Sequence, residues 1–437
     1  MSESLFPLFL ADAIVKPLRV LCEEGGGDIQ TGPFGSQLHA SDYVKEGIPS
    51  IMPKNIGDNR VSTEDIAYIT EEDAQRLARY RVRPGDIVYS RRGDVEKRAL
   101  IREAEDGWLC GTGCLRVRPG EGGLDSVFLS HYLAHPAVRN WVVQHAIGAT
   151  MPNLNTTILG DLPVVMYPQP TQKRIAHILG TLDDKIELNR RMNRTLEAIA
   201  QAIFKSWFVD FDPVHAKAEG REPVSMDPET AALFPDTFHD SPLGKIPKGW
   251  DVGNLRTIAT RRHQTIKPEQ IEDGTPYVAL DDIPRRSIAL DSWKAAEGIA
   301  STKSCFLEGD VLFGKLRPYF HKVVIAPTDG ICSTDIIVVT PLEDLWLAYV
   351  LMICSSAEFI AYNSAVMTGT KMPRTNWKDM SSYELPIPPR EIAADYQAVT
   401  QPLIDQLLCG IHEVPRLTEV RDALLPRLIS RELKGGA

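Results

Sequence analysis

Basic side chains follow two strand-like segments of the chain at matching places. Arg91 and Arg92 come directly after "DIVYS", and Lys315 and Arg317 come directly after "DVLFG". A guanidinium at the tip of a loop can contact a phosphate or read guanine through two parallel hydrogen bonds. A run of charge is often only a solvated face, but its recurrence at one position favours use. We therefore interpret these four side chains as candidate contacts to nucleic acid.

Two polar loops and a basic cluster add further candidates. The segments "GATMPNLN" and "GTKMPRTN" carry amides and cations that suit base edges and the phosphate backbone. A basic cluster early in the second half takes the place where the first half has residues 32–37. The candidate DNA-binding residues are therefore Arg91, Arg92, Asn153, Asn155, Arg261, Arg262, Lys315, Arg317, Lys371, Arg374 and Asn376.

The sequence patterns of common catalytic centres do not occur. Gly314-Lys315 is followed by leucine, so it is not a phosphate-binding loop, and no GxGxxG is found. The Asn-Pro-Pro-aromatic tetrapeptide of amino-group methyltransferases is absent, and Pro235-Asp236 has no acid-x-Lys nearby. His131 and His135 share a helical face without HExxH, and we interpret both as solvent-facing or locally satisfied. We predict no catalytic residue and no metal site in this chain.

Cys110 and Cys114 are close enough in sequence to form half of a metal site. Alternatively, they lie on one face of a single strand and point into the core. The corresponding positions of the second half hold Cys332 and Ile336. Because isoleucine replaces cysteine there, we favour the core interpretation.

The elements that must position these residues repeat along the chain. Segments of the first half recur in the second half in the same order, and each half has short strand-like runs followed by mixed helical patterns. Each half therefore predicts an α+β globule that is followed by a long helix. The matched segments are residues 47–56 with 274–283, 84–90 with 308–314, 109–119 with 331–341, 148–155 with 369–376, and 162–170 with 385–391.

A heptad-like pattern predicts the first long helix, from about residue 171 to residue 208. Its seam residues recur at alternating steps of four and three, which is typical of a coiled coil. Asparagine in such a seam costs stability but can fix the register and the partner. The seam residues are Ile175, Leu179, Leu182, Ile186, Asn189, Asn193, Leu196, Ala200, Ile203 and Trp207.

The second long helix is predicted from about residue 392 to residue 433. Pro402, Pro415 and Pro426 each remove a backbone donor, so we expect kinks or breaks. Its seam is predicted at Leu403, Leu407, Gly410, Val414, Leu417, Arg421, Leu424 and Leu428.

The charge of the chain is unevenly distributed. The net charge over 437 residues is −10, and a proline-rich acidic segment at residues 213–246 carries much of it. The apolar runs are short and the N-terminus has no basic leader, so the sequence predicts neither a membrane span nor a signal peptide. Seven scattered cysteines favour a reducing, cytoplasmic setting.

Several quoted stretches resemble the specificity subunit of type I restriction-modification systems. The similar stretches are "LDDKIELNRRMN", "FKSWFVDFDPV", "LFPDTFHDSPLGKIPKGW" and "EVRDALLPRLISREL". The resemblance implies two target-recognition domains, at residues 1–168 and 247–389. It also implies spacer helices at 169–212 and 390–437, with 213–246 as a linker. The helices are expected to pack as an antiparallel coiled coil with pseudo-two-fold symmetry.

The resemblance also implies a division of labour. Each globule would read one half of a gapped DNA target, and the halves should differ because the globules differ. Methyltransferase subunits would bring S-adenosylmethionine and methylate adenine. Motor-nuclease subunits would bring ATP and Mg²⁺, and this chain would bring no cofactor.

Two other functional classes remain open from the residues alone. One is a coiled-coil adaptor whose basic loops do not touch DNA. The other is a nuclease or methyltransferase with an unusual catalytic site.

Overall fold

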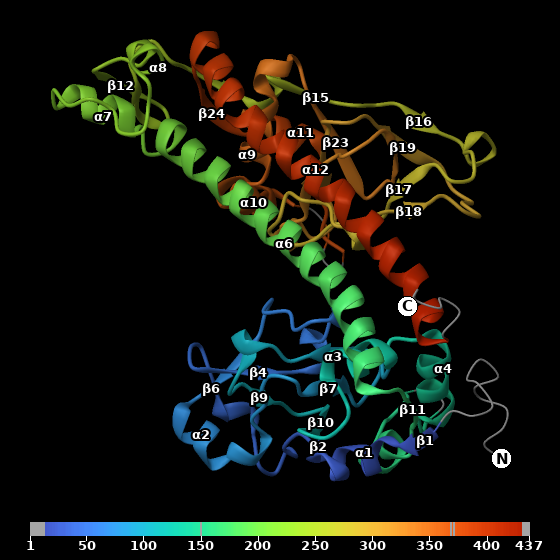
Figure 1. Ribbon diagram of the computed structural model, residues 1–437. Helices are drawn as coiled ribbons and strands as arrows, with labels where there is room; N and C mark the ends of the chain where they lie inside the picture. The colour runs from blue at the N-terminus through green and yellow to red at the C-terminus, as the bar shows by residue number, and fades with distance from the viewer. Residues whose placement is uncertain (1–13, 149–150, 368, 370–371, 431–437) are drawn as a thin grey trace. The chain divides into compact units, whose positions relative to one another are not determined.

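The computed structural model describes residues 14–148, 151–367, 369 and 372–430. The chain divides into two compact units (Figure 1). Unit 1 combines the chain up to Asp184 with the segment from Glu419 onward, and unit 2 comprises Lys185–Thr418. Each unit therefore contains part of both long helices.

Unit 1 is built on two sheets and a two-stranded ribbon. Its larger sheet has the order β2(Gly26–Thr31), β10(Cys114–Gly120), β7(Ile87–Ser90), β8(Arg98–Leu100) and β5(Asp58–Asn59). The smaller sheet has the order β3(Tyr43–Val44), β6(Ala67–Ile69), β4(Ile48–Ile51) and β9(Leu109–Cys110). The ribbon pairs β1(Ile14–Pro17) with β11(Pro163–Met166). The helices of unit 1 before the long helix are α1(Leu18–Glu24), α2(Glu71–Arg76), α3(Ser126–Tyr132), α4(Pro136–His145) and α5(Thr156–Gly160).

Unit 2 repeats this plan. One sheet has the order β15(Ala259–Arg261), β23(Ile336–Pro341), β20(Val311–Gly314) and β21(Val323–Ile325). The other has the order β16(Thr265–Ile266), β19(Lys303–Phe306), β22(Gly330–Cys332), β17(Pro276–Val278) and β18(Lys294–Ala295). One ribbon pairs β14(Asp251–Asn254) with β24(Glu384–Ile387). Its shorter helices include α9(Leu347–Cys354), α10(Ala357–Val366) and α11(Trp377–Ser381).

The register of the sheets shows that the matched sequence segments occupy equivalent positions. Val117 on β10 pairs with Ile87 on β7, and Val339 on β23 pairs with Val311 on β20. In both units this pair belongs to two antiparallel strands, and β7 and β20 each have a second antiparallel neighbour. The predicted α+β fold with two similar α/β globules is therefore confirmed.

The strands are ordered because their apolar residues pack into core clusters on both faces of the sheets: Ile87 and Val88 of β7 belong to different clusters, and so do Val311 and Leu312 of β20. All four residues of β7 and all four of β20 are buried. Such strands are covered on both faces and read as continuous apolar runs. In unit 2, α9 is buried from Ala348 to Cys354, so this short apolar helix belongs to the protein core.

Among the described residues, no single helix is long and apolar enough to cross a membrane. One bent pair, Asp344–Cys354 with Ala357–Val366, meets the length and composition test when taken together. It contains α9, whose residues pack inside unit 2.

The two long helices are α6(Gln169–Phe208) and α12(Arg390–Ile429), and their segments pack antiparallel within each unit, as predicted. In unit 2, Asn189 Nδ2 donates to Glu413 Oε2 at 2.7 Å, while Tyr396 contacts the Ala200 carbonyl near the other end. In unit 1, Arg421 bonds to Asp183 at 2.9 Å.

The seam of α6 lies where the heptad pattern placed it, but the buried face is wider. Ile175, Leu179, Ile186, Asn189 and Asn193 are buried, as are Ala200 and Trp207. Leu182, Leu196 and Ile203 are half-buried, whereas their neighbours Asp183, Glu197 and Phe204 are buried.

The buried row of α12 is displaced by one residue from the predicted seam over much of its length. Leu403, Leu417, Leu424 and Leu428 are half-buried. Leu407 and Val414 are buried, and so are Gly410 and four residues outside the predicted seam: Ile404, Ile411, Leu425 and Ile429. Ile404 and Ile411 belong to the core of unit 2, and Leu425 and Ile429 belong to the core of unit 1. Besides packing against α6, α12 therefore contributes side chains to the hydrophobic core of each unit.

We expected kinks or breaks at the prolines, and the expectation of breaks was wrong. α12 continues as one α-helix through Pro402, Pro415 and Pro426. Each proline removes one helical hydrogen bond. The apolar side chains buried along this helix supply packing energy that offsets the loss.

The acidic segment expected to be a linker is an ordered part of unit 2. It contains α7(Asp212–Ala218), α8(Pro228–Leu233) and a ribbon of β12(Phe238–Ser241) with β13(Gly244–Pro247). Phe234 is buried and packs edge-on against Trp207 with ring centroids 5.3 Å apart. Its acidic side chains thus decorate a folded region.

Candidate nucleic-acid interface

In unit 1, backbone hydrogen bonds fasten the basic loop to the polar loop. The Arg91 N–H donates to the Gly113 carbonyl at 2.8 Å, and the Leu154 N–H donates to the Arg91 carbonyl at 2.8 Å. Two residues further, the Gly93 N–H donates to the Pro152 carbonyl at 3.1 Å. The loop after β7 and the "MPNLN" loop therefore form one surface.

Unit 2 makes the same three bonds with different residues. The Lys315 N–H donates to the Asp335 carbonyl at 2.9 Å, and the Thr375 N–H donates to the Lys315 carbonyl at 3.0 Å. The Arg317 N–H donates to the Pro373 carbonyl at 2.9 Å. Lys315 is therefore the equivalent of Arg91, and Arg317 is the equivalent of Gly93. We call these two assemblies the loop clusters of unit 1 and unit 2.

Three predicted cations converge in the loop cluster of unit 2. Burial lowers the pKa of Lys315, and the neighbouring Arg261 and Arg374 lower it further, against the opposing effect of Asp335. Arg374 Nε lies 3.2 Å from Asp335 Oδ1. An anion that binds among these cations reduces the electrostatic repulsion between them. This geometry suits a phosphate group.

The loop cluster of unit 1 holds polar atoms that lack partners among the described residues. Arg91 Nε and Asn153 Oδ1 are buried without a hydrogen bond. The guanidinium of Arg91 lies 5.7 Å from the ring centroid of Phe34, and Arg92 is exposed. A buried unsatisfied group costs about 1–3 kcal/mol, so a ligand that satisfied these atoms would gain binding energy.

Other predicted DNA contacts have structural roles in the fold. Asn155 accepts a hydrogen bond from the Ile158 N–H and caps α5, and Asn376 does the same for α11 with Asp379. Such caps satisfy free amides at a helix start. Arg262 makes two hydrogen bonds to the buried carboxylate of Asp310, at 2.7 and 3.1 Å.

The basic cluster at the start of unit 2 does not take the place of residues 32–37. Arg261 pairs with Val339, as Ile29 pairs with Val117 in unit 1. Arg261 is the last residue of β15 and Arg262 directly follows this strand, whose register could not be predicted from the sequence. Lys371 lies outside the described residues.

Sequence reasoning missed Asp335, Phe34 and the proline carbonyls that join the loops. The Met-Pro dipeptide that recurs in the two polar loops could have indicated the proline carbonyls, because Pro152 and Pro373 are equivalent acceptors.

The cysteine pair lies in the core, but not on one strand. A turn at Gly113, whose φ is 85°, separates β9 from β10. Both thiols are buried in one apolar cluster with Ile51 and Val88, and burial raises the pKa of Cys110 to about 12. In the described part of the chain, no group of three or more His, Cys, Asp or Glu side chains could hold a metal ion.

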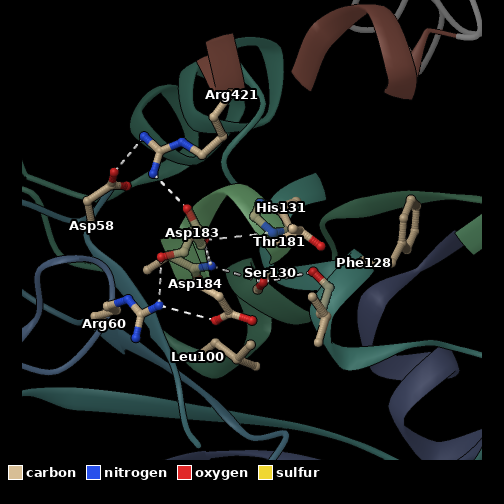
Figure 2. Close-up of polar contacts among 12 residues, drawn as sticks. Asp58, Arg60, Leu100, Phe128, Ser130, His131, Thr181, Asp183, Asp184 and Arg421 are labelled. Atoms are coloured by element: carbon tan, nitrogen blue, oxygen red, sulfur yellow. Dashed lines mark hydrogen bonds and ion pairs between the residues drawn. The ribbon is translucent and has the colours of Figure 1, made fainter. Parts of the chain in front are cut away.

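A separate polar network in unit 1 ties both long helices to the globule (Figure 2). Figure 2 shows Arg421 between two carboxylates, with Nη2 2.7 Å from Asp58 and Nη1 2.9 Å from Asp183. Asn59 Nδ2 donates to Asp183 at 3.1 Å, and His131 Nε2 lies 3.8 Å from the same carboxylate.

His131 and His135 are both buried, so neither faces solvent, but His135 is satisfied locally because its Nδ1 accepts from the Ala137 N–H at 3.2 Å. Burial lowers the pKa of His131 to about 4, with Asp183 opposing the shift. A cavity of about 460 Å³ beside the network is lined by charges of both signs, including Asp94, Lys97 and Arg139. Because charges of both signs line this cavity, it favours neither an anion nor a cation. We therefore interpret the polar network as the contact that holds the long helices against the globule of unit 1.

Comparisons with known proteins agree with these observations. Residues 36–198 match the family described as type I restriction modification DNA specificity domain. The chain is 23% identical to the type I restriction enzyme HindI specificity subunit of Haemophilus influenzae, across 88% of this chain and 95% of the relative. It is 24% identical to the MjaIX specificity subunit of Methanocaldococcus jannaschii, across 96% and 93%. Its fold is similar to the crystal structure of a type I restriction-modification S subunit from M. genitalium, with a TM-score of 0.52, 13% identity, and coverage of 97% and 98%.

Two α/β globules with equivalent loop clusters, together with the match to a DNA specificity domain, define a DNA sequence-specificity protein. Within that class, the chain belongs to the specificity subunits of type I restriction-modification systems. Such a subunit recognises DNA sequence and is itself non-catalytic.

Proposed function

We propose that each unit reads one half of a gapped, asymmetric DNA target. The observation that carries this proposal is the loop cluster, which is built twice with the same backbone bonds and different side chains. Arg91 and Asn153 in unit 1 correspond to Lys315 and Arg374 in unit 2. Because amide and cationic side chains favour different base edges, the two half-sites should differ.

The chain then directs adenine methylation or DNA cleavage by partner subunits. In this proposal, methyltransferase subunits bring S-adenosylmethionine, and motor-nuclease subunits bring ATP and Mg²⁺. The helices α6 and α12 act as a spacer and bind these partners, and the complex works in the cytoplasm. This chain contributes recognition of double-stranded DNA.

The test is the DNA affinity of the chain assembled with its methyltransferase partners, measured against salt on targets with either half-site altered. Arg91→Ala with Arg92→Ala should weaken binding and relax specificity only in one half-site. Lys315→Ala with Arg374→Ala should act only on the other. Each lost phosphate contact should lower the salt slope by about one, and each lost base contact should cost about 1–3 kcal/mol.

Lys248→Ala is the matched control, because Lys248 is an exposed cation outside the loop clusters. It should leave affinity and salt slope unchanged. If both double variants also behaved like the unaltered protein, the loops would be solvated faces and the helices would make this chain an adaptor.

A further inference from the structure

Exposed aromatic side chains are rare in the described part of the chain. Among the described residues, Phe34 and Tyr319 are the exposed large aromatic side chains, with 52% and 48% of their surface open. One lies in each unit. Exposed methionines also recur, since Met151 and Met372 are 62% and 48% open and each precedes the proline that joins a loop cluster.

Phe34 is held beside the loop cluster of unit 1. The Gly32 N–H donates to the Cys114 carbonyl at 2.9 Å, and Gly32 is packed so closely on Gly111 that a Cβ would overlap its carbonyl oxygen. The Phe34 carbonyl accepts from the Gln37 N–H at 2.8 Å. Arg91 lies over the ring. The aromatic side chain is therefore fixed against a cation of the proposed DNA surface.

Tyr319 is held by a strained loop of unit 2. The flanking Arg317 and His321 have left-handed φ values of 51° and 53°, which non-glycine residues rarely adopt. Two backbone bonds close a tight turn: the Phe320 N–H donates to the Arg317 carbonyl at 2.9 Å, and the His321 N–H donates to the Pro318 carbonyl at 2.8 Å. The rings of Tyr319 and Phe320 meet edge-on at 4.9 Å, and Arg285 lies 4.3 Å from the Phe320 centroid.

The two sites share chemistry but not sequence position. Phe34 follows β2, whereas Tyr319 follows β20. Arg91, which the proposed function assigns to DNA, lies 5.7 Å from the Phe34 ring centroid. Tyr319 lies two residues after Arg317, whose N–H donates to the Pro373 carbonyl of the loop cluster of unit 2. Strained backbone persists at sites where the surrounding structure fixes a functional geometry. A rigid, exposed ring among cations suits the π-face of a nucleic-acid base.

We propose that Phe34 and Tyr319 are wedge residues that stack against DNA bases, one in each half-site. The inference rests on the proposed function and adds a second mode of recognition to it. The loop-cluster cations would hold the phosphate backbone, and the rings would read how readily a base step opens. Pyrimidine–purine steps open most easily, so each wedge favours such a step at its place in the target.

The experiment uses the full chain assembled with its methyltransferase partners and a target carrying 2-aminopurine in one half-site or the other. Tyr319→Ala should weaken binding roughly tenfold, as expected for one lost stacking contact. It should leave the salt slope unchanged and reduce the 2-aminopurine fluorescence rise in the half-site read by unit 2. Phe34→Ala should do the same in the half-site read by unit 1.

Ring-retaining and distant variants separate stacking from folding. Tyr319→Phe and Phe34→Tyr should bind within about twofold of the unaltered protein, because each keeps a ring that can stack. Leu342→Ala removes an exposed apolar side chain elsewhere in unit 2 and should have no effect.

The outcomes distinguish this inference from the proposed function. If the Lys315/Arg374 variant weakens binding but both alanine variants bind and fluoresce like the unaltered protein, the wedges are refuted and DNA reading stands. A tenfold loss that came with a lower salt slope would assign these residues to backbone contact, which also refutes stacking. Failure of the unaltered assembly to bind DNA would overturn both.

Discussion

Arg261 and Arg262 are neighbours in sequence but have different surroundings in unit 2. Arg262 forms two hydrogen bonds with the buried carboxylate of Asp310, which also accepts from the Leu307 N–H at 2.8 Å. Unit 1 closes the same turn with Arg118 and Asp86, at 2.7 and 2.6 Å. Arg261 instead lies in the field of Lys315. Arg262 therefore stabilises the fold, whereas Arg261 is positioned to contact a ligand.

This difference predicts opposite results for two adjacent substitutions. Arg262→Ala should lower the free energy of unfolding by about 2 kcal/mol, because it leaves a buried carboxylate without its cation. Arg261→Ala should leave stability within about 0.5 kcal/mol and weaken DNA binding. Urea unfolding and DNA titration of both variants test this, and equal stability losses would contradict it.

His131 predicts a pH dependence of stability. Burial lowers its pKa in the folded protein to about 4, below the value of about 6.5 in an unfolded chain. The unfolded state therefore binds more protons between these values, and stability falls as pH drops through this window. Between pH 7.5 and pH 5 the loss should be about 2 kcal/mol.

The measurement is urea unfolding at both pH values, with His131→Gln as the control. The variant cannot titrate, so its stability should change by much less over the same range. A variant that lost as much stability as the unaltered protein would assign the effect to other groups. Burial opposes ionisation of Asp183, but His131 and Arg421 hold its pKa below the ordinary value, so it titrates at lower pH.

At this scale the sequence could predict which loops are polar, but not the role of each polar atom. Asn155 and Asn376 were candidates because amides suit base edges, and the same amides are good helix caps. Only the position of the Ile158 and Asp379 N–H groups decides between these roles. The repeated basic residues were informative because Arg91 and Lys315 do occupy equivalent places.

The long helices were predictable as elements because a heptad pattern is strong over many turns. The exact row of buried residues in α12 was not, since the helix packs against α6 and also against the core of each unit. A straight helix drifts from a seven-residue repeat. Because of this drift, Ile404 is buried in place of Leu403, and Ile411 is buried together with Gly410.

Gly410 gives a prediction for the packing of these helices in unit 2. Replacing a mid-helix glycine with alanine usually stabilises by about 1 kcal/mol. Here the new Cβ would overlap the buried side chain of Asn193. Gly410→Ala should therefore destabilise by about 1 kcal/mol.

Adding Asn193→Ala should reverse the sign, because it removes the obstructing amide. The double variant should be more stable than Asn193→Ala alone when both are unfolded in urea. If Gly410→Ala stabilises with Asn193 still present, the helices have room to adjust and close packing is not the reason for the glycine.

For the whole molecule, the internal repeat made the duplicated fold predictable, because five segments in register cannot easily arise by chance. The discontinuity of unit 1 was not predictable in this way. It depends on residues from Glu419 onward joining the first globule. The acidic segment was likewise read as a linker from its composition, whereas buried Phe234 anchors it in unit 2.

Modular specificity is the prediction at this scale. Replacing residues 1–165 with the matching part of a relative should change one half-site and leave the other, as shown by mapping methylated sites with the assembled enzyme. The donor segment should keep acid and amide groups at Asp58 and Asn59, because Arg421 and Asp183 remain in the recipient. A donor without them should recognise its half-site with reduced thermal stability. Simultaneous change of both half-sites would show that the readers are coupled.

Unit 1 is formed by two separate segments of the chain, and this determines the order in which the units can complete their folding during translation. Its core includes Leu425 and Ile429, and its polar network needs Arg421. A ribosome makes these residues only after all of unit 2 has been synthesised. The first globule must therefore wait, incompletely closed, for the last turns of α12, and a nascent chain cut short before them would expose that apolar surface to chaperones and proteases.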